Sequence, residues 1–324
     1  MTELTQTEIG QTGIHVSLVG MGCWPISGVT TLGVSEQDAL TTLEAAVDSG
    51  INFFDTAYCY GYSGESEKLL ARALGHRRDQ VVIASKGGIH WEDRVQKRDA
   101  SPETLKRQCE ESLRRLQTDV IDLYYLHAPD PRVPVEESAE GLLALLDAGK
   151  IRAVGVSNVT AAQMQRMAAV CPISASQPPY NMLQRDIEDE HLPWCCEQGV
   201  TVMVYWVLLK GLLAGHLSPA DRFDPPDGRS KYPMFQGEEF QKNLAFVDTL
   251  RPIASDAGLT VSQLVIGWTL AQPGIGVALC GGRRPAQIRE SAGAMVPGGL
   301  DAEFVSRVDQ AIADRGHAAS QTPV

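Results

Sequence analysis

Short apolar runs alternate with longer amphipathic segments along most of the chain. The runs are rich in Val, Ile, Leu and Phe, as is typical of parallel strands that are buried on both faces. Eight of them predict strands, at residues 16–19, 51–54, 81–86, 121–126, 151–156, 173–176, 200–204 and 277–279. Helix-start signals such as Ser101-Pro102, and glycine stops such as Gly50 and Gly75, predict helices between these strands.

This alternation predicts the fold class. The expected helices span residues 35–49, 65–74, 102–116, 135–148, 160–169, 187–198, 238–257, 261–271, 285–292 and 301–313. Eight βα units in a chain of 324 residues favour an α/β fold of the closed (β/α)8 type, a TIM barrel, over an open doubly wound sheet. No G-x-G-x-x-G follows the first strand, so the usual dinucleotide fingerprint of an open sheet is missing.

Three segments lie outside the alternation. Residues 4–17 alternate weakly around Gly10-Gln11-Thr12-Gly13 and predict an N-terminal β-hairpin. Residues 218–237 are polar and too long for an ordinary connection, which predicts a lid or binding loop. Residues 87–100 carry no pattern that predicts an element. We expect a single barrel domain with extra helices over residues 1–315 and a flexible C-terminal tail over residues 316–324.

Composition and charge narrow the function. The net charge is −12 with no basic block, which disfavours a nucleic-acid partner. The seven cysteines are irregularly spaced without a C-x-x-C pair, which indicates reduced thiols and disfavours structural zinc. The N-terminus lacks a basic region followed by an apolar run, and no stretch is long and apolar enough for a membrane span. We therefore expect a cytoplasmic protein with no membrane partner and no metal.

Polar side chains follow nearly every predicted strand. In a barrel, the C-terminal strand ends form one rim, where active sites are found. The residues at this rim are Gly22 and Trp24, Asp55 with Tyr60, Lys86, His127, Ser157 with Asn158, Gln177, Tyr205 and Gly281. Any one of them alone is more often structural, but their joint occurrence in order argues for a functional site.

Asp, Tyr, Lys and His together indicate proton transfer to a carbonyl. A free phenol has a pKa near ~10 and is a poor acid at neutral pH. An ammonium group beside Tyr60 would lower its pKa, and an acid beside Lys86 would hold that ammonium charged and in place. His127 could then donate a hydrogen bond to the oxygen being protonated while another group delivers hydride to carbon. A metal hydrolase fits less well without H-x-H or H-E-x-x-H, and a serine triad has no nucleophile elbow.

These residues resemble the aldo-keto reductase family, from Gly10 to about Ala294. The matching motifs are Gly50-Ile51-Asn52-Phe53-Phe54-Asp55-Thr56-Ala57-Tyr58-Cys59-Tyr60-Gly61, Ala84-Ser85-Lys86, Leu123-Tyr124-Tyr125-Leu126-His127 and Gly155-Val156-Ser157-Asn158. The resemblance implies that Tyr60 is the general acid/base. It also implies that Lys86 and Asp55 tune the pKa of Tyr60, and that His127 orients the substrate carbonyl.

The resemblance further implies an NADP(H) site without a Rossmann domain. Ser157, Asn158 and Gln177 would bind the nicotinamide carboxamide, and Tyr205 would stack on the ring. Glycines before a helix and the fork of Arg283 suit phosphate, so Arg283 is expected at the 2′-phosphate. The expected cofactor residues are Gly22, Trp24, Asp55, Ser157, Asn158, Gln177, Tyr205, Leu208, Lys210, Gly211, Gly281, Arg283, Gln287 and Glu290.

Three positions depart from the family pattern. Trp206-Val207-Leu208 replaces a common Ser-Pro-Leu, so Lys210 would have to compensate in binding the pyrophosphate. Cys280 replaces a usual proline, and Ser291 stands where an asparagine often contacts the adenine.

The sequence thus predicts an NADPH-dependent reductase of small aldehydes, ketones or sugars. Rim aromatics are expected to shape the substrate pocket, namely Trp24, Tyr58, Trp91 and Trp206. One alternative is a cofactor-binding regulatory protein similar to the β subunits of potassium channels. Another is a metal-dependent barrel hydrolase. The sequence does not indicate the substrate, the physiological direction or the oligomeric state.

Overall fold

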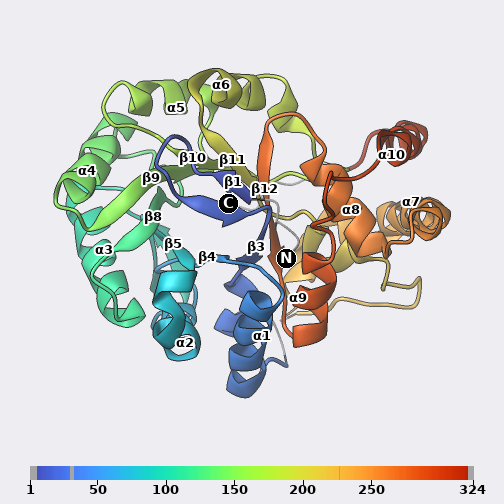
Figure 1. Ribbon diagram of the computed structural model, residues 1–324, viewed down its shortest axis with the longest axis horizontal. Coiled ribbons are helices and arrows are strands. Elements are labelled where there is room, and N and C mark those ends of the chain that lie inside the picture. The colour runs from blue at the N-terminus through green and yellow to red at the C-terminus, as the bar shows by residue number, and fades with distance from the viewer. Residues whose placement is uncertain (1–5, 30–32, 226, 320–324) are drawn as a thin grey trace.

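A computed structural model describes residues 6–29, 33–225 and 227–319, and a closed barrel of parallel strands forms its centre (Figure 1). The barrel strands in these residues are β3 (Val19–Gly22), β4 (Phe53–Asp55), β5 (Val82–Gly87), β8 (Ile121–Leu126), β9 (Ile151–Ser157), β10 (Ala175–Gln177), β11 (Thr201–Val204) and β12 (Ile275–Gly281). They pair in chain order, and β12 pairs with β3 to close the barrel. The predicted (β/α)8 barrel is confirmed.

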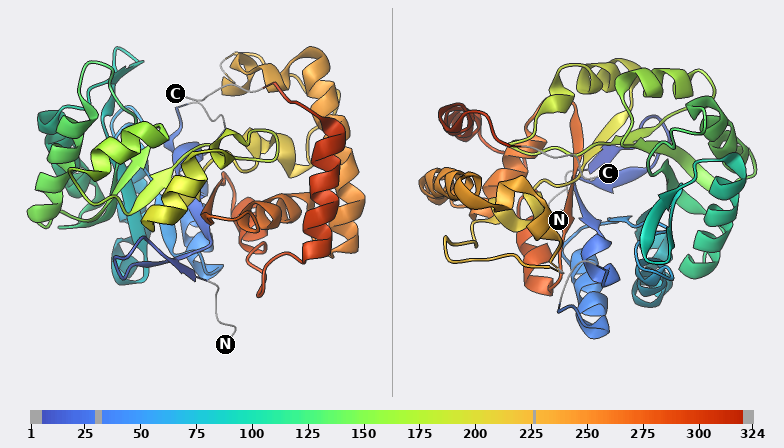
Figure 2. Two further views of the ribbon diagram at one scale, coloured as in Figure 1. Left: turned by 90° about the horizontal axis from the view of Figure 1, so that it is seen from above. Right: turned by 180° about the vertical axis from the view of Figure 1, so that it is seen from behind.

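Helices surround the barrel, and several begin at the capping residues that the sequence indicates. The side chains of Ser35, Thr160 and Thr260 each close a capping box, which satisfies the free N–H groups of the first turn. The helices are α1 (Glu36–Asp48), α2 (Glu65–Leu74), α3 (Pro102–Leu116), α4 (Val135–Asp147), α5 (Ala161–Ala168), α6 (His191–Gln198), α7 (Gly237–Asp256), α8 (Val261–Leu270), α9 (Pro285–Ala292) and α10 (Ala302–Arg315). Helices α7 and α10 lie side by side outside the ring (Figure 2).

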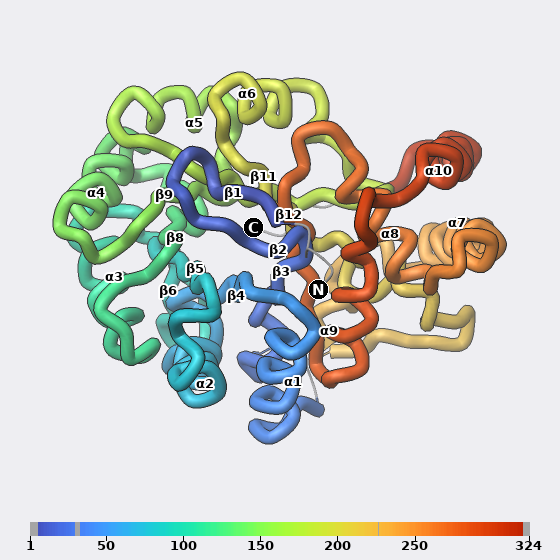
Figure 3. Tube along the Cα trace, viewed as in Figure 1, coloured from blue at the N-terminus to red at the C-terminus, as the bar shows by residue number. Residues whose placement is uncertain are grey.

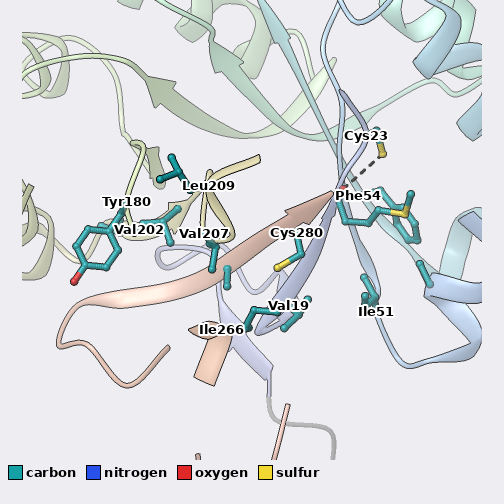
Figure 4. Packing of buried hydrophobic residues seen from close by; sticks show 14 of the residues in the cluster. Val19, Cys23, Ile51, Phe54, Tyr180, Val202, Val207, Leu209, Ile266 and Cys280 are labelled. Carbon is teal, nitrogen blue, oxygen red and sulfur yellow. Dashed lines mark hydrogen bonds between the residues drawn. The ribbon is translucent and has the colours of Figure 1, made fainter. Parts of the chain in front are cut away.

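The core has an inner and an outer layer, because successive strand residues point to opposite faces of the sheet. On β4, Phe53 packs inside the barrel and Phe54 packs outward against the helices. Figure 4 shows part of the outer layer, where Phe54 and Val19 lie among side chains from neighbouring strands and helices. Burial on both faces explains why the strands read as continuous apolar runs.

A hairpin closes the N-terminal end of the barrel. Strands β1 (Gln6–Glu8) and β2 (His15–Ser17) pair antiparallel and cross that end (Figure 3). Ile9, Ile14 and Val16 belong to the inner core layer. The predicted hairpin is confirmed over residues 6–17, whereas residues 4 and 5 lie outside the described residues.

Some predicted bounds are wrong. The expected strand 16–19 is divided, because Val16 ends in the hairpin and the barrel strand β3 begins only at Val19. Strand β10 begins at Ala175, two residues later than expected, and β12 is longer than expected at both ends. In the expected helix 187–198, a short 3-10 turn (Asp186–Glu188) precedes α6.

The C-terminal end of the barrel carries the long loops. A second hairpin, β6 (Ile89–Glu92) and β7 (Val95–Arg98), forms in the segment for which the sequence predicts no element. Residues 218–237 contain two short 3-10 turns, Gly228–Lys231 and Pro233–Phe235. In the expected tail, the Ala319 N–H donates to Glu239, and residues 320–324 lie outside the described residues. The tail and the single-domain assignment stay predictions.

In the described part of the chain, no helix combines the length and the apolar character that a bilayer span requires.

Candidate active site

A buried ion pair lies at the C-terminal end of two adjacent strands. Asp55 is the last residue of β4, and Lys86 lies near the end of β5. The Lys86 Nζ is 2.5 Å from the Asp55 Oδ1, and it also donates to the Thr56 carbonyl at 2.8 Å. Its third contact is the Tyr60 Oη, at 3.3 Å. Because an ammonium has three N–H donors, these contacts satisfy it fully, as a buried charge requires.

Tyr60 stands at the mouth of this pair. Its ring is 5.0 Å from the Trp24 ring in an edge-on contact and 5.9 Å from the His127 ring. Burial raises the pKa of Tyr60 well above its usual value, and the negative charge of Asp55 adds to the rise. The expectation of a lowered pKa is therefore wrong for this structure. Tyr60 is protonated at neutral pH, and Lys86 lies where it can stabilise the phenolate once the proton leaves.

His127 follows β8 directly. The backbone N–H of His127 donates to the Gly87 carbonyl at 2.8 Å, and the backbone carbonyl of His127 accepts from the Asn158 Nδ2 at 2.8 Å. Burial lowers the pKa of His127 well below its usual value, and the positive charges of Lys86 and Arg98 add to the decrease. The imidazole is therefore neutral at neutral pH and can donate only one ring N–H.

The residues predicted to bind the nicotinamide carboxamide form a hydrogen-bond network that includes Asp55. The Gln177 Nε2 donates to the Asp55 Oδ2 at 2.7 Å, and the Ser157 Oγ donates to the Gln177 carbonyl at 2.7 Å. Asn158 has a left-handed backbone with φ of 57°, and its Oδ1 accepts from the Tyr205 Oη at 2.8 Å. Side chains thereby connect the ends of the adjacent strands β9, β10 and β11 with the end of β4, which is not their neighbour in the barrel.

The segment after β11 has an unusual backbone. Trp206, Leu209 and Lys210 all have positive φ values, of 65°, 43° and 53°. Such conformations are costly for residues other than glycine and tend to occur at ligand-binding segments. The Lys210 Nζ lies 5.2 Å from the ring centres of both Trp206 and Tyr232, and burial lowers its pKa to about 8. Tyr232 belongs to the expected lid segment, so that segment contacts this wall of the site.

Leu208 and Gly211 belong to the same turn. The Gly211 N–H donates to the Leu208 carbonyl at 2.8 Å, and Gly211 has a φ of 93°, which glycine adopts without strain.

The segment from β12 to α9 offers backbone donors and an arginine. Helix α9 begins at Pro285 without a side-chain cap, as is common for anion-binding helix ends. The Arg283 N–H donates to the Gln287 Oε1 at 2.9 Å, and its side chain is exposed. Arg284, in contrast, is ion-paired with Asp38 of α1. Of these two arginines, Arg283 is the one left available for a ligand.

The remaining predicted cofactor residues flank this segment. Gly22 and Gly281 are direct partners in the pairing of β3 with β12. A Cβ at Gly281 would lie only 2.7 Å from the Pro25 Cγ, so this position requires glycine. Glu290 lies on α9, and its carboxylate is 3.8 Å from the His216 Nε2.

One predicted pocket residue does not fit. The Tyr58 Oη donates to the Glu111 Oε2 of α3 at 2.8 Å, and the Arg115 guanidinium lies 4.2 Å from its ring centre. Tyr58 therefore points toward α3, whereas Tyr60 contacts Lys86 and Trp24. Trp24 contacts Tyr60, and Trp206 contacts Tyr205.

Three residues near the site, Cys59, Tyr62 and Tyr232, are not among the predicted ones, whereas Trp91 is a predicted pocket residue. The Trp91 Nε1 donates to the Cys59 carbonyl at 2.8 Å, which ties the hairpin β6–β7 to the turn that carries Tyr60. The Cys59 Sγ lies 3.5 Å from the His127 Nδ1. Tyr62 and Tyr232 contact the rings of Trp91 and Trp206. Aromatic residues in otherwise polar loops were the available signal for Tyr62 and Tyr232, whereas Cys59 carried none.

Across the described ranges, no group of three or more His, Cys, Asp or Glu residues could hold a metal ion.

Comparison with known proteins identifies the family. The family model described as "Aldo/keto reductase family" matches residues 18–313. The chain belongs to the aldo-keto reductase family. Aldo-keto reductase YhdN of Bacillus subtilis is 41% identical over 285 residues, which cover 87% of this chain and 86% of that protein. Probable aldo-keto reductase 1 of Glycine max is 32% identical over 295 residues, covering 90% and 85%.

Solved structures of similar proteins have the same fold. The glycerol dehydrogenase AKR11B4 from Gluconobacter oxydans has a TM-score of 0.89 at 35% identity, covering 100% of this chain and 99% of that chain. The aldo-keto reductase AKR11C1 from Bacillus halodurans has a TM-score of 0.81 at 26% identity, with 98% of each chain covered. The family consists of oxidoreductases that typically use a nicotinamide cofactor.

Proposed function

We propose that this aldo-keto reductase uses NADPH to reduce an aldehyde, ketone or sugar, and that Tyr60 donates the proton to the carbonyl oxygen. The observation that carries the proposal is the contact of Tyr60 with a buried ion pair, in which the Lys86 Nζ lies 3.3 Å from the Tyr60 Oη and 2.5 Å from the Asp55 Oδ1. A phenol that loses its proton here becomes an anion beside a fixed ammonium.

NADPH, when bound, supplies hydride to the carbonyl carbon. The carbonyl oxygen then gains the proton of Tyr60, and the product is an alcohol. Lys86 stabilises the phenolate that remains until solvent protonates it again. Asp55 holds the Lys86 side chain in place through their contact. The neutral imidazole of His127 donates a hydrogen bond to the carbonyl oxygen and orients it toward Tyr60.

The donor set of the rim suits a dinucleotide with a 2′-phosphate. Ser157, Asn158 and Gln177 bring hydroxyl and amide groups together beside the ion pair, as a carboxamide would require. Lys210 and Arg283 supply cations for the phosphates, in a chain whose overall charge is −12. The strained backbone at residues 206–210 also supports ligand binding in this segment.

The aromatic side chains near Tyr60 and Tyr205 suit the apolar parts of a substrate. Trp24 and Trp206 present aromatic faces, and the indole N–H of Trp91 already donates to a backbone carbonyl. Since one structural relative is a glycerol dehydrogenase, the substrate screen includes glycerol and three-carbon aldehydes and ketones beside aldoses and aromatic aldehydes.

The test measures NADPH oxidation across that screen with the wild type and Tyr60→Phe. We expect Tyr60→Phe to lower kcat by about 1,000-fold, because it removes the proton donor. NADPH binding, followed by fluorescence quenching, should change little. Tyr58→Phe is the matched control, since Tyr58 bonds to Glu111 on α3, and it should keep full turnover. Unchanged turnover in Tyr60→Phe would refute the assignment.

A cofactor-binding regulatory subunit would need the cofactor site but no proton donor. The complete set of Asp55, Lys86, Tyr60 and His127 therefore favours an enzyme. Tight NADPH binding without turnover on any carbonyl compound of the screen would favour the regulatory alternative.

A further inference from the structure

A thiol lies against the Nδ1 ring nitrogen of His127. Cys59 is 1% exposed, and its Sγ is 3.5 Å from the His127 Nδ1. The two residues come from different βα loops and meet because Cys59 immediately precedes Tyr60. The Cys59 carbonyl is held by the Trp91 indole at 2.8 Å, so the position of this turn is fixed on both sides.

The surroundings of the thiol are otherwise apolar. Cys59 belongs to a small cluster with Ala57, Ile89 and Ala128. Among the described residues, the His127 Nδ1 is the hydrogen-bond partner of the thiol. A buried donor is normally paired, and here the imidazole nitrogen is the group available to accept.

Both groups are neutral at neutral pH. Burial raises the pKa of the Cys59 thiol to about 12, so its proton stays on sulfur. Burial also keeps His127 in its neutral form, as described above. A neutral imidazole carries one proton, on either Nδ1 or Nε2, and the hydrogen bond on one nitrogen decides which form is present.

The two tautomers differ in how well they satisfy the buried groups. If the thiol donates to Nδ1, a strong acceptor is paired and the proton of the ring lies on Nε2. If Nδ1 instead carries the proton and donates to sulfur, it meets a weak acceptor, and the thiol hydrogen is left in an apolar cluster. The first arrangement is the more stable one.

We propose that Cys59 is a positioning residue that donates its S–H to the His127 Nδ1 and thereby places the ring proton on Nε2. In the reaction proposed above, on which the catalytic meaning of this inference rests, that Nε2–H is the group that donates to the substrate carbonyl. Cys59 itself touches neither substrate nor cofactor.

The test reads the tautomer directly. Long-range ¹H–¹⁵N spectra of the full-length ¹⁵N-labelled protein distinguish a protonated ring nitrogen from an unprotonated one. The chain has seven histidines, so the His127 signals are assigned by their loss in His127→Gln. We expect Nε2–H in the wild type and a mixture of both tautomers in Cys59→Ala. Wild-type spectra with the proton on Nδ1 would overturn the proposal.

Kinetics provide the second measurement. Cys59→Ala should lower kcat by about fivefold, as loss of one weak hydrogen bond would, with little change in NADPH affinity. Cys59→Val fills the space without a donor and should behave like Cys59→Ala. Cys59→Ser restores a donor and should recover both the tautomer and most of the rate. Cys109→Ala, at an equally buried cysteine on α3, controls for loss of packing and should leave the His127 spectrum unchanged.

The two levels of inference can fail separately. A Cys59-dependent tautomer in a protein that reduces no carbonyl compound would refute the proposed function but support the positioning of His127. Carbonyl reduction with the same tautomer and the same rate in the wild type, Cys59→Ala and Cys59→Val would overturn the role of Cys59 alone.

Discussion

Two buried aspartates with cationic partners lie at opposite ends of the barrel. Asp55 ends β4 at the C-terminal rim, whereas Asp122 is the second residue of β8, at the N-terminal end. Both are 3% exposed, so both face a similar cost of desolvation. They differ in what their partners contact next.

Asp122 is hydrogen-bonded to two arginines and to a backbone N–H. Its carboxylate accepts from the Arg78 Nη2 at 2.7 Å, the Arg152 Nη1 at 2.9 Å and the Ile83 N–H at 2.9 Å. Arg78 also donates to the carbonyls of Val81 and Val120. Arg78 also donates to the Thr118 Oγ1 at 3.3 Å, and the bonds of this group join β5, β8 and β9.

Lys86, the partner of Asp55, also contacts a side chain at the rim. The Lys86 Nζ donates to Asp55, to the Thr56 carbonyl and to the Tyr60 Oη, which lies at a rim lined by aromatic side chains. The same ion-pair chemistry therefore joins strands at one end and, in the reaction that we propose, stabilises the phenolate of Tyr60 at the other. This division agrees with the general placement of active sites in TIM barrels.

Removal of Lys86 should have the largest effect. We expect Lys86→Met to lower kcat for carbonyl reduction by about 1,000-fold, because the phenolate of Tyr60 loses its stabilising charge. It also leaves Asp55 buried without a cation, which should destabilise the protein. The double variant Asp55→Asn/Lys86→Met separates the two effects, since urea unfolding should return toward wild type while the rate stays low. Recovery of the rate in the double variant would contradict the role of Lys86.

The matching change at the other end should alter stability alone. Asp122→Asn should lower the free energy of unfolding by about 2 kcal/mol, because the partly exposed guanidinium of Arg78 loses its counterion and a charge-assisted hydrogen bond. The kcat of the folded enzyme should remain at the wild-type level. Urea denaturation and turnover at a temperature well below the transition give the two quantities. A loss of kcat with normal stability would break the comparison.

The sequence predicted which residues meet at the rim better than it predicted how burial there changes their pKa values. Asp55, Lys86 and His127 could be placed together because strand ends in a closed barrel share one rim, whatever the packing between them. The direction of the shift in the Tyr60 pKa could not be predicted in this way, since burial is its largest cause and burial depends on the whole tertiary structure.

Local backbone conformation accounts for the other misses. The hairpin β6–β7 turns at Asp93 and Arg94, with φ of 49° and 61°, where Asn-Gly or Asp-Gly would have been the usual signal. Tyr58 and Tyr60 are two residues apart and similar in type, yet only the fold determines that one bonds to α3 and the other faces Lys86.

The two arginines before α9 also differ in whether another side chain binds them. Arg284 is bound to Asp38, whereas the Arg283 side chain is exposed. We expect Arg283→Ala to weaken NADPH binding by about 30-fold with little effect on NADH, because it removes a partner of the 2′-phosphate. Arg284→Ala should affect both cofactors equally and only slightly. Fluorescence titrations with NADPH and NADH measure both, and equal losses for the two cofactors in Arg283→Ala would refute the assignment.

Lys210 should produce the smallest effect, which depends on pH. Unlike Lys86, it forms no ion pair among the described residues, and burial lowers its pKa to about 8. Its ammonium is therefore largely present at about pH 7 and largely lost at about pH 9. If Lys210 binds the pyrophosphate, NADPH affinity should fall by about tenfold over that interval, and Lys210→Met should bind more weakly at pH 7 but show no such fall. The NADPH affinity of that variant should therefore depend little on pH over this interval, and a slope as steep as that of the wild type would assign the titration to another group.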